Sequence, residues 1–234
     1  MRSLPPGNRL INELEPDDRD ALLAAATAVE LAPGQVLHEP DDWIEHLHFI
    51  DSGFCSSVAV LEDGRTVETL MIGRDGVLGV VASVTPQRAH TRSVAQVACQ
   101  ARRVDAARFR ALAAQRPAIR DAVGDYMARL QKELEQSAAC NALHHAGQRF
   151  AKWLLRGHDR VDGDTLNLTQ EYLAAMLGSQ RTTVNEAAQA LQKAGAIAYS
   201  RGRITVLDRA DLERAACECY RAGDAFHASR DGER

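Results

Sequence analysis

Residues 169–197, TQEYLAAMLGSQRTTVNEAAQALQKAGAI, predict two short helices joined by a tight turn. Apolar residues recur at helical spacing and give each helix one buried face. These residues are Leu173, Met176 and Leu177 in the first helix and Val184, Ala187, Ala188 and Leu191 in the second. Gly178 suits the end of the first helix, because glycine tolerates the left-handed conformation there. Thr169 and Ser179 place a hydroxyl where each helix is expected to start, as an N-cap requires.

The second helix, expected over residues 180–194, opens with side chains that form hydrogen bonds. They are Gln180, Arg181, Thr182, Thr183, Asn185 and Glu186. A helix with such a row on one face and apolar residues on the other is suited to the major groove of DNA. Arg181 can pair with guanine, Gln180 with adenine or a phosphate, and the two threonines with a thymine methyl or the backbone. Thr169 and Ser179, at helix starts, suit phosphate contacts. A two-helix hairpin inside an ordinary bundle is the alternative interpretation.

A short strand–turn–strand pattern follows the two helices. Residues 197–200 and 203–207 are rich in β-forming side chains and flank Arg201 and Gly202. A helix pair followed at once by a small hairpin predicts a winged helix-turn-helix. Arg201 and Arg203 would then lie at the wing tip, near the phosphate backbone. A solvated loop would also favour arginine, so neither residue decides the matter by itself.

Composition limits the classes that remain. The chain has 234 residues, of which 45% are hydrophobic, and a formal net charge of −4. Residues 148–207 hold eight basic and five acidic residues, a local charge of +3, which leaves −7 for the rest. A basic module on an acidic carrier is compatible with DNA binding, since local potential matters more than the total. No run approaches the ~20 apolar residues of a membrane span. The chain shows no signal-peptide pattern, and its five cysteines lack the spacing of a disulfide framework. We therefore expect a cytoplasmic protein.

The first half of the chain predicts mainly strands. Residues 8–28 have a helical pattern, and short β-forming runs follow at residues 36–37, 47–50, 57–61, 66–71 and 93–97. Turn signals rich in Asp, Gly and Pro separate these runs. Many short strands at nearly regular spacing indicate a β-roll, barrel or sandwich. With the helices of the second half, the expected fold class is α+β.

A long helix is predicted after the strands, with Pro117 in its first turn. Its apolar residues form one narrow seam at steps of three or four: Ile119, Val123, Tyr126, Leu130 and Leu134. Such a seam is typical of a helix that pairs with its own copy, so we expect a homodimer interface there. The alternative is that the seam packs on the β-domain of its own chain. A further apolar helix is expected around Phe150, and a last one over residues 210–220, capped by Asp208.

This order of parts resembles the CRP/FNR family of bacterial transcription regulators. The resemblance covers nearly the whole chain and is most specific over residues 169–191. In the first half it is carried by Pro33-Gly34 with Glu39, residues 47–53, Gly64-Arg65 with Glu68, and residues 75–79. It implies a cyclic-nucleotide-binding-like β-roll at 1–116, a dimerisation helix at 117–146 and a winged helix-turn-helix at 147–226. It also implies a DNA-binding homodimer on a two-fold symmetric operator, RNA polymerase as a further partner, and no membrane association.

The recognition helix departs from the family pattern for the best-known operators. Those members place arginine, then glutamate, and a second arginine one turn later. Here Arg181 is followed by Thr182, and Glu186 takes the later position. We therefore expect a different operator sequence.

The effector pocket also departs from the cyclic-AMP-binding pattern, in which a glutamate holds the ribose and an arginine–serine pair the phosphate. No acidic residue follows Val77 before Thr85, and the arginine–serine position falls near Ala89 and His90. Glu133 and Leu134 replace the hydroxyl pair that would meet the purine. The pocket candidates are Gly76, Val77, Leu78, Arg88, His90, Arg92, Ser93, Glu133 and Leu134. These departures disfavour cyclic AMP as the effector. Either an unidentified effector controls the protein, or the amount of protein alone sets its activity.

Other cofactors find little support. Iron–sulfur members use closely spaced N-terminal cysteines, and none precedes Cys55 here. Haem would need an axial ligand such as His46, His48 or His90, but a lone histidine on a strand is more often structural. Redox sensing by the thiols has no physical argument for their activation.

No metal site is predicted either, although pH or metal sensing by two histidines near the hinge stays open. Cys217 and Cys219 are too close in sequence for the usual zinc spacing, and His144 and His145 point to different sides of a helix. No catalytic motif is present, so we expect no enzyme. The remaining alternative is a nucleotide- or redox-sensing module that acts through a protein partner.

Overall fold

The computed structural model describes residues 7–200 and 202–221. The chain forms two compact units, one with residues 1–65 and 70–128 and the other with residues 66–69 and 129–234. The division falls inside the central helix, α4 (Pro117–Leu143), which sequence analysis had set apart as a region of its own.

The first unit begins with two short helices, α1 (Arg9–Asn12) and α2 (Pro16–Ala25). Asn8 caps α1, and its side-chain amide donates hydrogen bonds to the carbonyl oxygens of Ile50 at 2.9 Å and Gly76 at 2.8 Å. The helical prediction for residues 8–28 was too long at its end, because a strand starts at Thr27. The β-branched residues there favour a strand, and the segment pairs along its length with a later strand.

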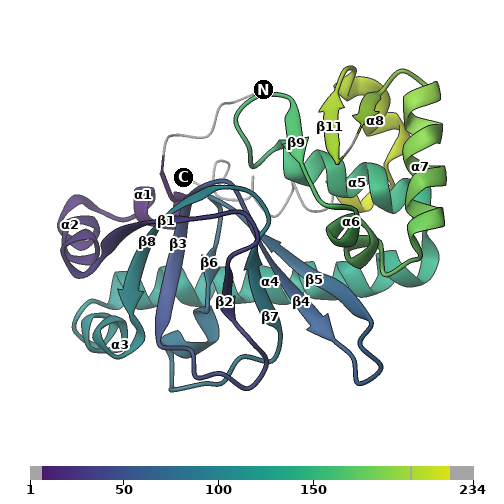
Figure 1. The fold of residues 1–234 in the computed structure, drawn as a ribbon. Helices are drawn as coiled ribbons and strands as arrows, with labels where there is room; N and C mark the ends of the chain where they lie inside the picture. The colour runs from purple at the N-terminus through teal and green to yellow at the C-terminus, as the bar shows by residue number, and fades with distance from the viewer. Residues whose placement is uncertain (1–6, 201, 222–234) are drawn as a thin grey trace. The chain divides into compact units, whose positions relative to one another are not determined.

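Two four-stranded antiparallel sheets make up the β-roll (Figure 1). One has the order β1-β8-β3-β6 and the other β2-β7-β4-β5. The strands are β1 (Thr27–Leu31), β2 (Val36–His38), β3 (His46–Ser52), β4 (Cys55–Val60), β5 (Thr66–Ile72), β6 (Val77–Leu78), β7 (Arg92–Ala95) and β8 (Cys99–Asp105). A 3₁₀ turn, η1 (Val80–Ser83), follows β6. The predicted β-roll is confirmed.

Strand β8 was not predicted, although it pairs with both β1 and β3. Its buried side chains are Cys99, Ala101 and Val104, and two arginines interrupt the alternation that would identify a strand. Burial of Ile50, Leu78 and Ala101 in one cluster shows that β8 supplies part of the core between the sheets.

Helices close the first unit. Helix α3 (Ala106–Gln115) is capped by Asp105, whose carboxylate accepts a hydrogen bond from Arg108 N–H at 2.8 Å. Phe109 packs against Phe49 of β3 with ring centroids 6.1 Å apart. Helix α4 then starts at Pro117, as predicted, because proline fits a first turn where no intrahelical N–H bond is lost.

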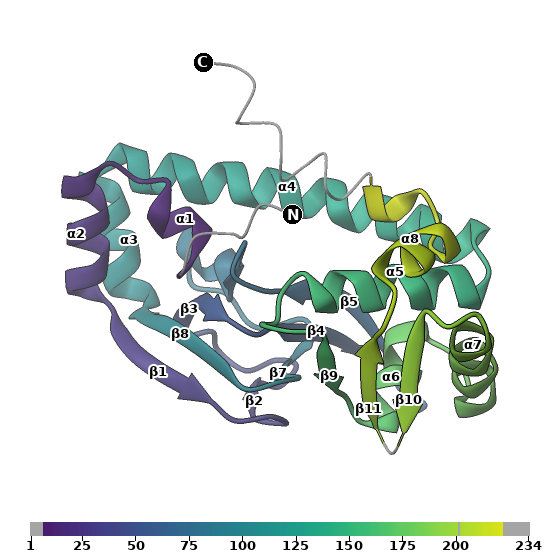
Figure 2. The same ribbon diagram turned by 90° about the horizontal axis from the view of Figure 1, so that it is seen from above.

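The second unit is built around α5 (Ala146–His158), which packs against α6, α7, α8 and β9 (Figure 2). The elements that follow α5 in this unit are β9 (Thr165–Asn167), α6 (Gln170–Leu177), α7 (Arg181–Lys193), β10 (Ile197–Ser200), β11 (Arg203–Val206) and α8 (Arg209–Ala215). Phe150, Leu154 and Leu155 of α5 are at most 1% exposed. Sequence analysis missed β9, whose three residues join the sheet of order β10-β11-β9.

The last helix is shorter than predicted. Asp208 caps α8 as expected, accepting from Asp211 N–H at 2.9 Å. The chain becomes extended at Ala216, however, so the helix expected over residues 210–220 stops at Ala215. None of the helices within residues 7–200 and 202–221 is long and apolar enough to cross a membrane.

Candidate nucleic-acid interface

The turn between α6 and α7 holds the two helices in a fixed geometry. Thr169 caps α6 through its hydroxyl, which accepts from Tyr172 N–H at 3.0 Å. Gly178 ends α6 in the left-handed conformation, with φ 56° and ψ 37°, as predicted. The expected cap by Ser179 is wrong. Helix α7 starts one residue later than that cap would require, with Gln180 at the N-cap, and the Ser179 hydroxyl donates to the Leu177 carbonyl at 3.2 Å.

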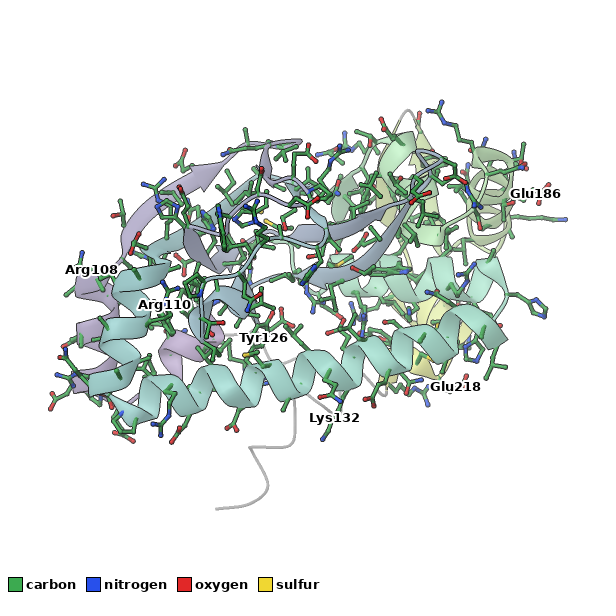
Figure 3. The ribbon with its side chains drawn as sticks, turned by 90° about the horizontal axis from the view of Figure 1, so that it is seen from below. Arg108, Arg110, Tyr126, Lys132, Glu186 and Glu218 are labelled. Atoms are coloured by element: carbon green, nitrogen blue, oxygen red, sulfur yellow. The ribbon has the colours of Figure 1, made fainter. Side chains whose placement is uncertain are left out.

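Helix α7 has one buried face and one exposed face. Val184, Ala187, Ala188 and Leu191 are buried, as the periodicity predicted. The exposed face carries Gln180, Arg181, Thr182, Asn185 and Glu186, while Thr183 is half-buried. Figure 3 shows Glu186 on the outward side of this helix. Within the described part of the chain, the side chains of Arg181, Thr182, Asn185 and Glu186 make no hydrogen bond or ion pair with one another or with any other residue, so they remain available to a partner.

The exposed face continues along α7 beyond the residues that sequence analysis named. Asn185, Gln189, Gln192 and Lys193 line an open groove of about 560 Å³ together with Tyr199 of β10. Asn185, Gln189 and Lys193 follow one another at steps of four residues, so their shared face was readable from the sequence. Tyr199 was not, since only the packing of β10 on α7 brings it there. Burial raises the pKa of Tyr199, which keeps its hydroxyl protonated.

The predicted hairpin is present beside α7. Strands β10 and β11 are antiparallel, with Ser200 opposite Arg203, so the connection between them is only two residues long. Gly202 has φ +78°, which L-residues rarely adopt, and its carbonyl accepts from Leu168 N–H at 2.8 Å. Arg203 is exposed. Arg201, the other predicted wing residue, lies outside the described residues.

A polar network holds α8 to the end of α5. The Arg209 guanidinium donates to Asp159 at 2.7 Å and to the His158 Nδ1 at 2.7 Å. Because arginine has only donors, His158 Nδ1 accepts, and its Nε2 proton points to Asp164 at 2.9 Å. Tyr220 completes the network by donating to Asp159 at 2.9 Å. This network holds the His158 ring in one orientation, with Nδ1 toward Arg209 and Nε2 toward Asp164.

The candidate effector residues of the β-roll are occupied by contacts within the chain. A Cβ added at Gly76 would lie 2.5 Å from the Tyr126 hydroxyl, so Tyr126 fills the space beside that glycine. The Arg88 guanidinium stacks 4.4 Å from the Trp43 ring centroid and donates to the Asp41 carbonyl at 2.5 Å. Arg92 pairs with Glu39 at 2.8 Å.

The remaining effector candidates are divided between core and surface. Val77, Leu78 and Ser93 are buried, and His90 is exposed. Glu133 accepts from Arg156 at 2.5 Å, and the two side chains are 13% and 8% exposed. Glu133 therefore neutralises a buried guanidinium of α5 inside the second unit. Leu134 is 43% exposed.

The seam of α4 is not the uniform dimer face that its spacing predicted. Ile119, Val123 and Tyr126 are at most 5% exposed in the single chain, so they are not available to a second copy. The alternative interpretation, packing within the chain, holds for these three residues. Spacing could not distinguish the two, because intrachain and interchain burial require the same apolar stripe. Leu130 is partly exposed, and the role of Leu130 and Leu134 in a homodimer interface stays a prediction.

The three histidines considered for haem lie in the first unit. His48 is buried, and its ring lies 6.4 Å from that of His38 and 6.3 Å from that of His46. Burial, then the neighbouring His38, His46 and Arg103, lower the pKa of His48 to about 3. Burial also lowers the pKa of His38. The rings of His48 and His38 are held neutral as parts of the structure, whereas His90 is exposed.

A β-roll followed by a winged helix-turn-helix defines a class of sensor-linked DNA-binding proteins. The model of the Crp-like helix-turn-helix domain matches residues 148–215, and that of the cyclic nucleotide-binding domain matches residues 28–116. The chain belongs to the CRP/FNR family of transcription regulators and has the architecture of that family, with a helix-turn-helix DNA-binding domain.

Solved structures share this fold. FixK2 from Bradyrhizobium japonicum has a TM-score of 0.69 at 18% identity, over 82% of this chain and 98% of that one. A CRP-family transcriptional regulator from Thermus thermophilus has a TM-score of 0.69 at 21% identity, over 80% and 96%. The c-di-GMP responsive global regulator CLP from Xanthomonas campestris has a TM-score of 0.65 at 17% identity, over 82% and 99%. Among curated protein sequences, none matches the chain significantly.

Proposed function

We propose that this protein regulates transcription as a homodimer that reads a two-fold symmetric operator through α7 and the β10–β11 wing. The observation that carries this proposal is the exposed face of α7. Arg181, Thr182, Asn185 and Glu186 are exposed and have no side-chain partner among residues 7–200 and 202–221, while the opposite face is buried. A helix that only supported a hairpin would gain nothing from this arrangement, whereas base edges in the major groove supply donors and acceptors for all four side chains.

Each proposed contact has its own role. Arg181, in the first turn of α7, would donate two hydrogen bonds to guanine. Gln189, Gln192 and Lys193 extend the same surface toward the phosphate backbone. Arg203 of the wing would contact phosphates of a neighbouring groove, as would Arg201, which lies outside the described residues. The backbone amides at the starts of α6 and α7, which begin after Thr169 and Gln180, would bind phosphate oxygens.

DNA binding by full-length protein tests this proposal. Fluorescence anisotropy with labelled duplexes, first random and then enriched by selection, should give affinity that falls steeply with salt concentration. Lys193→Ala should reduce the slope of log K against log salt by about one, without changing sequence preference. Arg65→Ala is the control, because it removes an exposed arginine from the β4–β5 hairpin. Absence of salt-dependent binding would favour the alternative, a sensing module that acts on a protein partner.

We propose that the homodimer forms through the second half of α4. Leu134 is 43% exposed and Leu130 partly so, and both lie on the seam after its buried residues end. Leu134→Glu should convert a dimer to a monomer in analytical ultracentrifugation and weaken operator binding, since both half-sites are then not bound together. Leu143→Glu is the control, because Leu143 is 77% exposed and lies outside the predicted seam. A dimer that survives Leu134→Glu would place the interface elsewhere.

We propose that cyclic AMP does not control this regulator. Tyr126 fills the space beside Gly76, and Arg88, Arg92 and Glu133 are each engaged within the chain. Calorimetry with cyclic AMP should show no binding. Calorimetry with c-di-GMP, the signal named for the Xanthomonas protein, tests whether that nucleotide is the effector. Footprinting with and without cell extract separates an unknown effector from control by protein level.

We also propose that the protein is cytoplasmic and contacts RNA polymerase. Co-purification with the polymerase tests that contact.

A further inference from the structure

Four side chains that commonly bind metals meet near the C-terminal end of α4. Cys140 and His144 are one helical turn apart at this end, and Cys217 and Cys219 lie just after α8 ends. Their three sulfurs and one imidazole nitrogen all lie within 4.8 Å of one another. The cysteines are at most 2% exposed, and the His144 side chain is 15% exposed. All four residues belong to the second unit, and none takes part in the proposed DNA contacts.

The distances within this cluster suit a tetrahedral metal ion. Zinc binds sulfur at about 2.3 Å and imidazole nitrogen at about 2.0–2.1 Å, so ligand atoms of a tetrahedral site lie about 3.5–3.8 Å apart. Cys140 Sγ and Cys217 Sγ are 3.6 Å apart, and Cys219 Sγ and His144 Nδ1 are also 3.6 Å apart. Since the other separations do not exceed 4.8 Å, shifts of about 1 Å would complete the tetrahedron.

A buried lysine supplies independent support. Lys152 of α5 is 2% exposed, and its ammonium lies 3.3 Å from Cys140 Sγ. Lys152 forms no salt bridge with a carboxylate of the described residues, and its ammonium also lies 5.3 Å from the centroid of the Trp153 ring. A buried ammonium needs a compensating charge. Zn²⁺ with three thiolates and a neutral imidazole carries a charge of −1, which Lys152 would balance.

Two further contacts orient the ligands. The Gln136 amide donates a hydrogen bond to Cys219 Sγ at 3.0 Å, as expected beside a thiolate. His144 Nε2 lies 3.2 Å from the Glu218 carboxylate, and Nδ1 lies on the side of the sulfurs, 3.6 Å from Cys219 Sγ. A carboxylate behind a ligating histidine is the usual outer shell of zinc sites, because it fixes the tautomer and raises ligand basicity.

We propose that Cys140, His144, Cys217 and Cys219 bind one Zn²⁺ in a tetrahedral structural site. The protein supplies all four ligands, so no position is open for water or substrate, and the role is structural. The ion would link Cys217 and Cys219, which follow α8, to the C-terminal end of α4. This link would fix the position of the segment after α8 within the DNA-binding unit. The sequence did not predict this site. Cys217 and Cys219 are too close in sequence for the usual zinc spacing, and His144 and His145 cannot easily bind one ion together. Only the fold brings Cys140 and His144 next to Cys217 and Cys219.

Metal content of the full-length protein tests the proposal. Protein purified under reducing conditions without chelator should contain about one zinc per chain by plasma mass spectrometry. Replacement by Co²⁺ should give the intense visible absorption of tetrahedral thiolate-rich cobalt, together with thiolate-to-metal charge transfer. The proposal is overturned if the purified protein lacks zinc and the reduced, metal-free protein takes up neither Zn²⁺ nor Co²⁺. Recovery of a Cys140–Cys217 disulfide with no metal, after lysis in the absence of oxygen, would also overturn it.

Variants separate ligation from folding. Cys217→Ser and His144→Gln should each lose zinc, whereas Cys99→Ser, a buried cysteine of the β-roll, should keep it. Glu218→Gln should keep the Co²⁺ spectrum but bind zinc about 10- to 100-fold more weakly. Circular dichroism checks that each variant is folded, and Co²⁺ titration of folded variants gives the affinity. A Cys140→Ser, Cys217→Ser double variant that is folded and still holds one zinc would overturn the assignment.

Discussion

The β-roll and helix α7 use their polar side chains in opposite ways. In the β-roll, the arginines predicted to meet an effector are engaged by Trp43, Asp41 and Glu39. In the second unit, the polar residues of α7 that were predicted to meet DNA have no described partner. A residue type therefore indicates a binding site only when the fold leaves that side chain unoccupied. The helix-turn-helix architecture of the family is retained here, whereas the sequence predicts that the β-roll lacks the side chains of the cyclic-AMP-binding pattern.

The strongest test of this contrast is Glu133, which sequence analysis placed in the effector pocket. If it serves structure by neutralising Arg156, then Glu133→Gln should lower the free energy of unfolding by about 3 kcal/mol, because a nearly buried guanidinium loses its partner. Urea denaturation measures the loss. Glu135→Gln is the control, since Glu135 is exposed on the same helix. Unchanged stability together with a loss of effector response would restore Glu133 to the ligand pocket.

The buried histidine of the β-roll predicts acid sensitivity in the first unit. Burial lowers the pKa of His48 from 6.5 to about 3, so the folded state favours the neutral ring. The unfolded chain takes up a proton below its own pKa. Stability is therefore complete above about pH 6.5 and falls as the pH drops toward 3. Going from about pH 7.5 to about pH 5 should reduce it by about 2 kcal/mol.

Replacement of the ring sharpens this second prediction. His48→Leu should flatten the pH dependence measured by denaturation at a series of pH values, with a residual slope from His38. His90→Gln, which changes an exposed histidine, should leave the slope as it is. A wild-type protein with equal stability at both pH values would mean that a charged ring is tolerated beside Arg103.

On the DNA-reading face, Arg181→Ala should weaken binding to the selected operator by about 1–3 kcal/mol, or roughly 5- to 150-fold. The loss should be confined to operators with guanine at one position of each half-site. Competition between operator variants measures this preference. Thr182→Ser is a mild control that keeps a hydroxyl. If Arg181→Ala reduced affinity equally for all sequences, the side chain would be a phosphate contact.

The smallest expected effect concerns the cap of α6. Thr169→Ala removes the hydroxyl that accepts from Tyr172 N–H, and should lower stability by about 1 kcal/mol. Thr169→Ser retains the oxygen and should recover most of this loss. Ser179→Ala tests the corrected assignment in the same way, because a hydroxyl that does not cap α7 should be nearly neutral on removal. Thermal unfolding of the three variants compares them directly.

Local signals explain why much of the fold was predictable. The helix pair around Gly178, the hairpin around Gly202 and the start of α4 at Pro117 depend on conformational preferences of single residues and on periodicity. Strands β8 and β9 escaped prediction because their alternation is short or interrupted by arginine, and only pairing with neighbours stabilises them. Local pattern also misplaced the start of α7, because the N-cap is Gln180 and not the predicted Ser179.

By itself, the amino-acid sequence determined which faces of the helices are apolar, where turns occur and which residue types can meet DNA, because these follow from spacing and backbone preference. Tertiary structure alone decided which polar groups are already paired, as at Glu133, and which distant residues share a site, as at Cys140 and Cys217. Pairing and proximity across tens of residues depend on how the chain packs, and no local pattern encodes that distance.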